Sequence, residues 1–188
     1  MLTTLSEDLA EWAREAIELY TRNAGEGAER MPEYFLPAYA FQKNAALGKD
    51  KKFIFTLETN SSVILKYYTE QQERQNTVVQ MPEKLETKRY DMVAYDLVTD
   101  PKNGSFFALI EYKKDKYSAE DADKLRTVLS KLSAIPAGII IGRVYGEEER
   151  KKSQKACENN GDMWREIEFH IDESNKKSWV FVATIQKK

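Results

Sequence analysis

The sequence has little of several features that would narrow its function at once. It contains a single cysteine, Cys157, so no disulfide can form within the chain. Its only histidine, His170, leaves little material for a zinc site or a histidine-based nuclease. No stretch approaches the roughly 20 apolar residues that a membrane-spanning helix needs. The first residues lack the basic region and apolar core of a secretory signal, so we expect a cytoplasmic protein that does not bind membranes.

A strong net charge is also missing. The 188 residues include 29 Lys and Arg against 31 Asp and Glu, which gives a formal net charge of −2. Proteins that bind nucleic acid through many phosphate contacts usually carry a marked excess of positive charge. The total charge therefore gives no support to nucleic-acid binding, although the basic residues could still gather on one face. No internal repeat, glycine-rich phosphate loop or Ser-His-Asp pattern is present.

The composition favours one folded domain. Apolar residues make up 41% of the chain and charged residues 32%, which suits a core beneath a charged surface. We interpret 1–27 as a helical extension, 31–145 as the core, and 146–188 as a helix followed by two strands. Within 32–47, Pro37 either kinks the helix or marks the start of its regular part, with Glu33 in the entry turn.

The order of the predicted elements indicates an α/β fold with a mixed central sheet flanked by helices. Helices are expected where apolar residues recur at helical spacing, and strands where β-branched and aromatic residues gather between turn signals. The predicted elements are a helix capped by Ser6 that ends at 23–27, a helix over 32–47, strands at 52–59, 62–69, 77–80, 89–99 and 105–113, a helix capped by Ser118, a strand at 137–144, a helix at 147–158, and strands at 165–171 and 178–186.

The stretch from 89 to 113 carries the residues of most interest. Residues 100–104 (Asp-Pro-Lys-Asn-Gly) are a strong turn signal between two predicted strands. With the turn centred near Lys102, Asp91 lies opposite Lys113, and Glu111 is its diagonal neighbour within roughly 7–8 Å. Glu111 and Lys113 share a face because the side chains of a strand alternate. Two carboxylates and one ammonium group are therefore predicted to converge.

These three groups suit a particular chemistry. Two carboxylates at this spacing favour a hard divalent cation such as Mg²⁺ or Mn²⁺. A bound metal ion can polarise a phosphate oxygen and help to generate hydroxide from water. A neighbouring lysine can orient or deprotonate the attacking water, or stabilise the developing negative charge. Together these are the parts needed to hydrolyse a phosphodiester bond.

The plain alternative is that Glu-x-Lys on a strand is an ordinary surface pair, and for the bare triplet this is the more common case. The flanking residues favour the functional interpretation. Apolar residues precede Glu111 and follow Asp91, so these charges lie at the ends of strands with a buried pattern. Ser118 with Asp121 forms a capping-box pattern, and the helix that starts there leads to the apolar run 137–144, as a crossover connection would.

Residues 89–93 (Arg-Tyr-Asp-Met-Val), followed by 108–113 (Ala-Leu-Ile-Glu-Tyr-Lys), resemble the signature of the PD-(D/E)xK nuclease superfamily. The resemblance covers roughly 31–145 and implies a restriction-endonuclease-like fold. It also implies that Asp91 and Glu111 bind the metal ion and that Lys113 is the catalytic lysine. Tyr90 stands where the motif has its proline, a position that varies within the superfamily.

Further residues are candidates by the same resemblance. Many members of the superfamily add a glutamate from the first core helix, and Glu33 is the match here, with Glu58 on the first predicted strand as a second candidate. The alternative for Glu33 is a glutamate favoured near a helix N-terminus by the helix dipole. Lys114, Lys116 and Lys124 follow the motif and are candidates for contacts with a phosphate backbone. The alternative for each lysine is an ordinary solvated surface.

We therefore expect a metal-dependent nuclease that uses Mg²⁺ or Mn²⁺ and acts on nucleic acid, DNA ahead of RNA. A homodimer, or partner proteins that supply targeting, would be in keeping with such an enzyme. The alternative from another class is a non-catalytic module on the same fold that binds nucleic acid or protein. An unrelated α/β interaction protein, with Glu-x-Lys on its surface, is a third interpretation.

Overall fold

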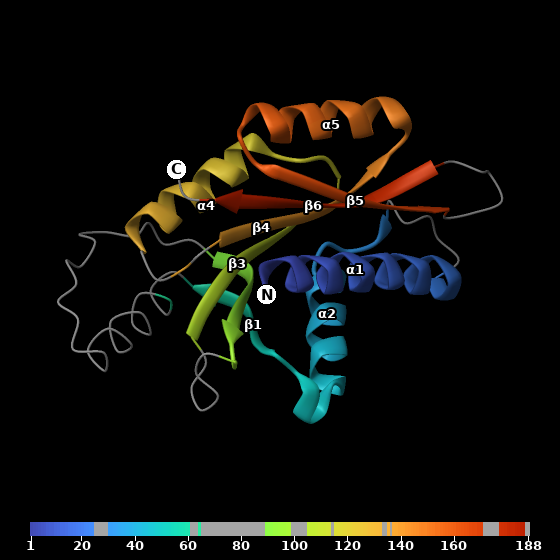
Figure 1. Cartoon of the computed structure of the whole chain (residues 1–188). Helices are drawn as coiled ribbons and strands as arrows, with labels where there is room; N and C mark the ends of the chain where they lie inside the picture. Colours follow the sequence, from blue (N-terminus) through green and yellow to red (C-terminus); the bar gives the residue numbers. More distant parts are fainter. Residues whose placement is uncertain are drawn as a thin grey trace.

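The computed structural model describes residues 1–24, 30–60, 64, 89–98, 105–113, 115–132, 135, 137–170 and 177–186. These residues form a six-stranded mixed sheet with helices on both faces (Figure 1). The elements are α1 (Leu2–Ala24), α2 (Phe35–Ala46), a 3₁₀ turn (Gly48–Asp50), β1 (Phe53–Asn60), β2 (Arg89–Asp96), β3 (Ser105–Lys113), α4 (Ala119–Lys131), β4 (Ala137–Tyr145), α5 (Glu147–Asn159), β5 (Met163–His170) and β6 (Lys177–Gln186). The predicted α/β class, with a mixed central sheet between helices, is confirmed.

The strands lie in the order β1-β2-β3-β4-β6-β5. β3 and β4 are parallel, and every other neighbouring pair is antiparallel. α4 is the crossover between the two parallel strands, as the sequence predicts. β4 and β6 are neighbouring interior strands of the sheet, and their nearly continuous apolar residues are buried on both faces.

The two faces of the sheet carry separate apolar cores. α1 and α2 cover one face, and α4 and α5 cover the other (Figure 1). β3 contributes to both cores because its side chains alternate: Ile110 and Tyr112 face α1 and α2, whereas Leu109 faces α4 and α5. Glu111 and Lys113 therefore lie on the α4 face. The segments predicted as an extension and as a C-terminal addition pack on this same sheet or belong to it.

The predicted start is wrong for the first helix and confirmed for the second. The sequence predicts that Ser6 caps the first helix, but α1 begins at Leu2 and Ser6 is buried inside it. The apolar stripe explains the difference, because Leu5 is fully buried and extends the packed face by one turn toward the N-terminus. α2 begins at Phe35, so Pro37 lies in the first turn, where its missing N–H needs no partner. The alternative in which the regular helix begins near Pro37 is confirmed.

Of the remaining predicted elements, some are confirmed, one is wrong where it is described, and one lies outside the described residues. Ser118 caps α4, and its Oγ accepts a hydrogen bond from the backbone N–H of Asp121. The predicted strand at 77–80 lies outside the described residues. Of the predicted strand at 62–69 only Ile64 is described, and the prediction is wrong there because Ile64 is helical and fully buried. No described helix has the length and apolar character needed to cross a membrane.

Candidate metal-binding site

The candidate site lies where β2 and β3 stop pairing. The last pair of their ladder is Met92 with Ile110. One step further, the carboxylate of Asp91 accepts a hydrogen bond of 2.7 Å from the backbone N–H of Tyr112. A side-chain oxygen thus satisfies a backbone donor that strand pairing no longer reaches. This bond fixes the Asp91 carboxylate against β3, beside Glu111 and Lys113.

The register differs from the predicted one by two residues. Continuing the ladder past Met92 and Ile110 places Asp91 opposite Glu111, not opposite Lys113. At the other end of the hairpin β2 stops at Asp96, three residues before its predicted end, and a register shift between Ala94 and Tyr95 reduces the offset to two residues at Asp91. The Asp96 carboxylate accepts a hydrogen bond of 2.7 Å from the N–H of Val98, a local turn that ends the strand early. Because the shift is an even number of residues, the faces of the side chains do not change.

Glu111 and Lys113 meet the first turn of α4 on this face. The Lys113 Nζ atom lies 3.6 Å from Glu111 Oε2 and 3.2 Å from Asp121 Oδ2. All three side chains are largely buried, with 15% of Glu111, 24% of Lys113 and 18% of Asp121 exposed. The structure therefore brings the predicted trio of Asp91, Glu111 and Lys113 together, and it adds Asp121.

Sequence reasoning identified Asp121 only as part of the cap of α4. Its carboxylate in fact lies between two lysines, with Oδ2 on Lys113 and Oδ1 on Lys124 at 3.1 Å. The available signal was the crossover itself. A helix that starts a few residues after a strand and packs back over it brings its first turn to the end of that strand. An acidic residue three positions after the cap then points toward Lys113.

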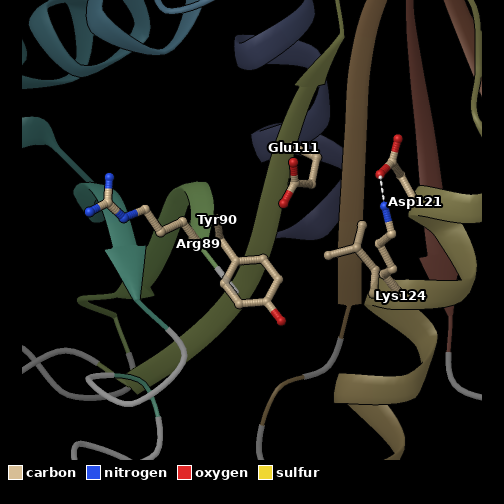
Figure 2. A pocket seen from close by; sticks show the side chains of 6 residues that line it. Arg89, Tyr90, Glu111, Asp121 and Lys124 are labelled. Carbon is tan, nitrogen blue, oxygen red and sulfur yellow. Dashed lines mark hydrogen bonds and ion pairs between the residues drawn. The ribbon is translucent and has the colours of Figure 1, made fainter. Parts of the chain in front are cut away.

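A cavity of about 250 Å³ opens beside these groups (Figure 2). It lies between the start of β2 and the first two turns of α4, with β3 behind it. Its lining residues are Arg89, Tyr90, Glu111, Asp121, Lys124 and Leu125. Glu111 lines it from β3 and Asp121 from α4, whereas the guanidinium of Arg89 turns away toward Glu58, 3.3 Å distant. The cavity thus has acidic groups at its base and basic groups at its rim.

The electrostatics of the two carboxylates are unusual. Burial, followed by the charge of Asp91, raises the pKa of Glu111 to about 8. Burial also raises the pKa of Asp91, although the Tyr112 N–H and the charge of Lys113 act in the opposite direction. When two neighbouring carboxyl groups both have a raised pKa, the positive charge around them is too small to stabilise their ionised forms. A cation bound between them would supply it.

The other two groups are already paired. Burial alone would lower the pKa of Lys113, but the charges of Glu111 and Asp121 outweigh it and raise the pKa. Burial would raise the pKa of Asp121, yet hydrogen bonds from Lys124 and within the helix cap, with the charge of Lys113, lower it. Lys113 is therefore an ammonium group and Asp121 a carboxylate at neutral pH.

The two candidates for an additional glutamate lie in different places. Glu33 is exposed in the turn before α2, which packs on the opposite face of the sheet. Glu58 lies on the edge strand β1, opposite Asp91 in the register set by Leu57 with Met92. Its charge is one of the causes that raise the pKa of Asp91. Glu58 also has a positive φ of 51°, which interrupts regular pairing at this point.

The three candidate lysines also differ. Lys124 lies at the cavity, where its ammonium is shared between Asp121 and Glu120. Lys116 is exposed in the bend before α4. Lys114 lies outside the described residues. Their contact with a phosphate backbone stays a prediction.

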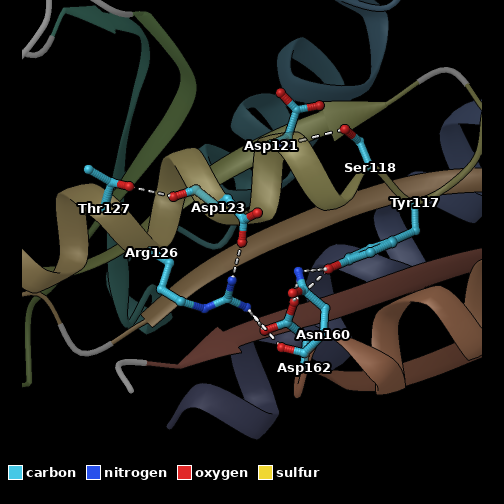
Figure 3. A network of polar contacts seen from close by, with 8 residues as sticks. All are labelled: Tyr117, Ser118, Asp121, Asp123, Arg126, Thr127, Asn160 and Asp162. Carbon is cyan, nitrogen blue, oxygen red and sulfur yellow. Dashed lines mark hydrogen bonds and ion pairs between the residues drawn. The ribbon is translucent and has the colours of Figure 1, made fainter.

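A second polar cluster lies on the other side of α4 (Figure 3). Asp162 has 1% of its side chain exposed, and its Oδ1 lies 2.6 Å from a guanidinium nitrogen of Arg126. Its Oδ2 accepts a hydrogen bond of 2.6 Å from the Tyr117 hydroxyl, which in turn accepts one from Asn160. No local signal in the sequence predicts this cluster, because its members come from the segment before α4, the middle of α4, and the turn before β5.

The donor set suits Mg²⁺ or Mn²⁺ better than a softer metal. The described residues contain no group of three or more His, Cys, Asp or Glu side chains arranged around one ion. Asp91 and Glu111 offer oxygen ligands only, and Mg²⁺ is commonly held by one or two carboxylates together with water and substrate phosphate. The pair therefore fits such an ion, with Glu111 giving up its proton when the ion binds.

Comparison with known proteins does not extend these observations. No family model, no curated protein and no solved structure matches the chain. The likeness to the PD-(D/E)xK nucleases therefore depends on residues 89–93 and 108–113 alone, and membership of that superfamily stays a prediction.

Proposed function

We propose that this protein is a metal-dependent nuclease that hydrolyses phosphodiester bonds of nucleic acid, with DNA ahead of RNA as substrate. One observation carries the proposal: Asp91, Glu111 and Lys113 converge beside an open cavity, with the pKa of both carboxylates raised. Perturbed acids gathered at a cavity are typical of functional sites. A structural role alone would not require two such acids with so few donors.

Each residue has a definite task in this proposal. Asp91 and Glu111 would hold the divalent ion, which would supply polarisation of a phosphate oxygen and a lower pKa of bound water. Lys113 lies 3.6 Å from the Glu111 carboxylate, and its ammonium group stabilises the negative charge that develops on the phosphate. Lys124, with its stem along the cavity, contacts a neighbouring phosphate. Arg89 can do the same once it leaves Glu58, because such an exposed pair is weak.

The test is a cleavage assay on single- and double-stranded DNA and RNA with Mg²⁺ or Mn²⁺, and with a chelator as blank. Asp91→Asn keeps an oxygen that accepts from Tyr112, so it removes the charge with little change to the fold. Lys113→Ala removes the ammonium group. We expect metal-dependent cleavage by the wild type and at least a hundredfold loss, on the order of that seen for removal of one electrostatic group, in both variants.

Matched controls come from α5, on the far side of α4 from the site. Glu149→Gln and Lys151→Ala make the same kinds of change at exposed positions, and we expect full activity from both. Absence of cleavage together with absence of any metal-induced rise in melting temperature would contradict the proposal. Metal-induced stabilisation, or nucleic-acid binding, without cleavage would instead support the non-catalytic module. That second function is favoured by the near-neutral total charge of the chain.

A further inference from the structure

The ammonium group of Lys113 lies in a place where a metal ion could be expected. It is within 4 Å of two carboxylates that belong to different elements, Glu111 on β3 and Asp121 on α4. We propose that Glu111 and Asp121 hold this ammonium in the position of a second cation, so that the site takes one divalent ion and not two. This inference rests on the proposed function, since it concerns the number of ions in the same site.

The geometry is that of a filled cation position. Two-metal phosphodiesterase sites place their ions about 3.5–4 Å apart, bridged by carboxylates that both ions share. Glu111 would be the shared group here, with Asp91 on one side and Asp121 on the other. The Lys113 ammonium contacts both Glu111, at 3.6 Å, and Asp121, at 3.2 Å. Lys113 occupies the position between Glu111 and Asp121, which leaves the Asp91 side for the one divalent ion.

Asp121 is held in this position by its own helix. Its backbone N–H donates to Ser118 Oγ at 3.2 Å, which fixes the first turn of α4 over the end of β3. An ammonium group is a compact charge with three donors, so it can satisfy two carboxylates at once. A side chain that is 24% exposed and ion-paired on two sides is also costly to displace. Asp121 is therefore a positioning residue for Lys113.

Lys124 is the group that could imitate Lys113 in an experiment. Its Nζ lies 3.1 Å from the other oxygen of Asp121, and the side chain is 40% exposed. If Lys113 is removed, Lys124 can turn inward and occupy the same position. The decisive variant therefore lacks both lysines.

The test counts Mn²⁺ ions bound to each variant, by electron paramagnetic resonance of free Mn²⁺ and by calorimetry, without any substrate. We expect one ion per chain in the wild type and two in Lys113→Ala/Lys124→Ala, because Glu111 and Asp121 then face each other without a cation. Adding Asp121→Asn to that variant is expected to return the count to one. Lys113→Arg keeps a positive charge in place and is expected to bind one ion. Where the double variant does not fold, Lys113→Ala/Lys124→Gln replaces it.

A matched control separates this effect from a general change of charge. Lys151→Ala/Lys152→Ala removes two exposed lysines of α5, and we expect it to bind one ion. Two ions in the wild type, or one ion in the variant that lacks Lys113 and Lys124, overturns this inference and leaves the proposed nuclease standing. No ion in the wild type overturns the proposed metal-dependent function, and this inference with it.

Discussion

The two polar clusters on either side of α4 contain similar residues and differ in how their carboxylates are satisfied. Asp162 has an arginine on one oxygen and a tyrosine hydroxyl on the other, and it is almost completely buried. Glu111 has one lysine at 3.6 Å and two acidic neighbours, and burial raises its pKa to about 8. The first cluster is complete without any ligand, and the second is not. A buried acid therefore indicates function when its neighbours leave it short of positive charge and hydrogen-bond donors.

The same contrast can be described by what each cluster joins. The Asp162 cluster connects α4 through Arg126 to the turn that follows α5, so its bonds hold a helix in place. The Glu111 cluster connects β2, β3 and α4 around a cavity. Stability should therefore depend on the first cluster and activity on the second.

The largest expected change in stability follows from Asp162→Ala. It removes the buried acidic partner of Arg126, which keeps only the more exposed Asp123, and the acceptor of the Tyr117 hydroxyl; breaking a buried pair costs at most about 3–5 kcal/mol. Urea denaturation followed by circular dichroism measures the free energy of unfolding. Metal-dependent cleavage by the folded fraction is expected to remain. Glu111→Gln is the counterpart, for which we expect no loss of stability and a large loss of cleavage; equal stability losses in the two variants would contradict the comparison.

Gly142→Ala should disturb both clusters, with a smaller effect. A Cβ atom there would lie 2.6 Å from the Phe181 ring and 2.9 Å from the carbonyl oxygen of Asp115. The chain leads from Asp115 into Tyr117 and the first turn of α4, so one displacement reaches both sides of the helix. We expect a loss of about 1–3 kcal/mol, which is typical of an overpacked core. Metal affinity, measured by calorimetry, should fall in the same variant.

Gly138→Ala is the matched control on the same strand. Its Cβ atom would approach the Leu125 side chain at 3.1 Å and would meet no backbone atom as close as Asp115 O. That contact is longer than the 2.6 Å and 2.9 Å contacts at Gly142, so Leu125 has to give by only a few tenths of an ångström. We therefore expect Gly138→Ala to lose less stability and to keep its metal affinity. Equal effects of the two alanine substitutions would show that the close approach of the Asp115 backbone to Gly142 is not what positions α4.

The pH dependence of stability should also distinguish the clusters. The pKa of Glu111 is raised to about 8 in the folded protein, above the usual range of an unfolded glutamate. Between these values the unfolded chain has lost the proton that the folded chain keeps, so the free energy of unfolding falls as the pH rises from about 5 to about 8. One such group contributes at most about 1.4 kcal/mol per pH unit. Added Mg²⁺ should oppose this fall, because it binds the ionised form.

Glu111→Gln provides the control for this titration. We expect the decline in stability over the same pH range to be shallower in the variant, and Mg²⁺ to have little effect on it. Urea unfolding at a series of pH values measures both slopes. Parallel curves for the wild type and Glu111→Gln would show that another group causes the dependence.

Local signals in the sequence were enough to predict the framework of the site. The turn residues 100–104 predict the hairpin, Ser118 predicts the start of α4, and the apolar run 137–144 predicts a strand buried on both faces. Each of these signals acts within a few residues along the chain. The convergence of Asp91, Glu111 and Lys113 followed because an error of two residues in the register leaves the side chains on the same face.

What the sequence did not reveal depends on contacts between distant segments. Asp121 was interpreted through its own helix, and its pairing with Lys113 needs the packing of α4 over β3. The cluster around Asp162 needs α4 against the turn between α5 and β5. The early end of β2 coincides with a side-chain hydrogen bond at Asp96, in a stretch where several residues could have formed the turn. Contacts of this kind leave no periodic pattern of apolar residues in the sequence.

The smallest predicted difference concerns which additional glutamate supports the metal ion. Glu58 lies opposite Asp91 in the strand register and its charge acts on that carboxylate, whereas Glu33 lies before a helix on the other face. We therefore expect Glu58→Gln to weaken Mn²⁺ binding a few fold and Glu33→Gln to leave it unchanged, as measured by calorimetry. Both side chains are largely exposed, so neither variant should alter stability by more than about 0.5 kcal/mol. If only Glu33→Gln weakens Mn²⁺ binding, the segment before α2 supplies the additional acid, as the likeness to the nuclease superfamily implies. Glu58 would then serve only in its ion pair with Arg89.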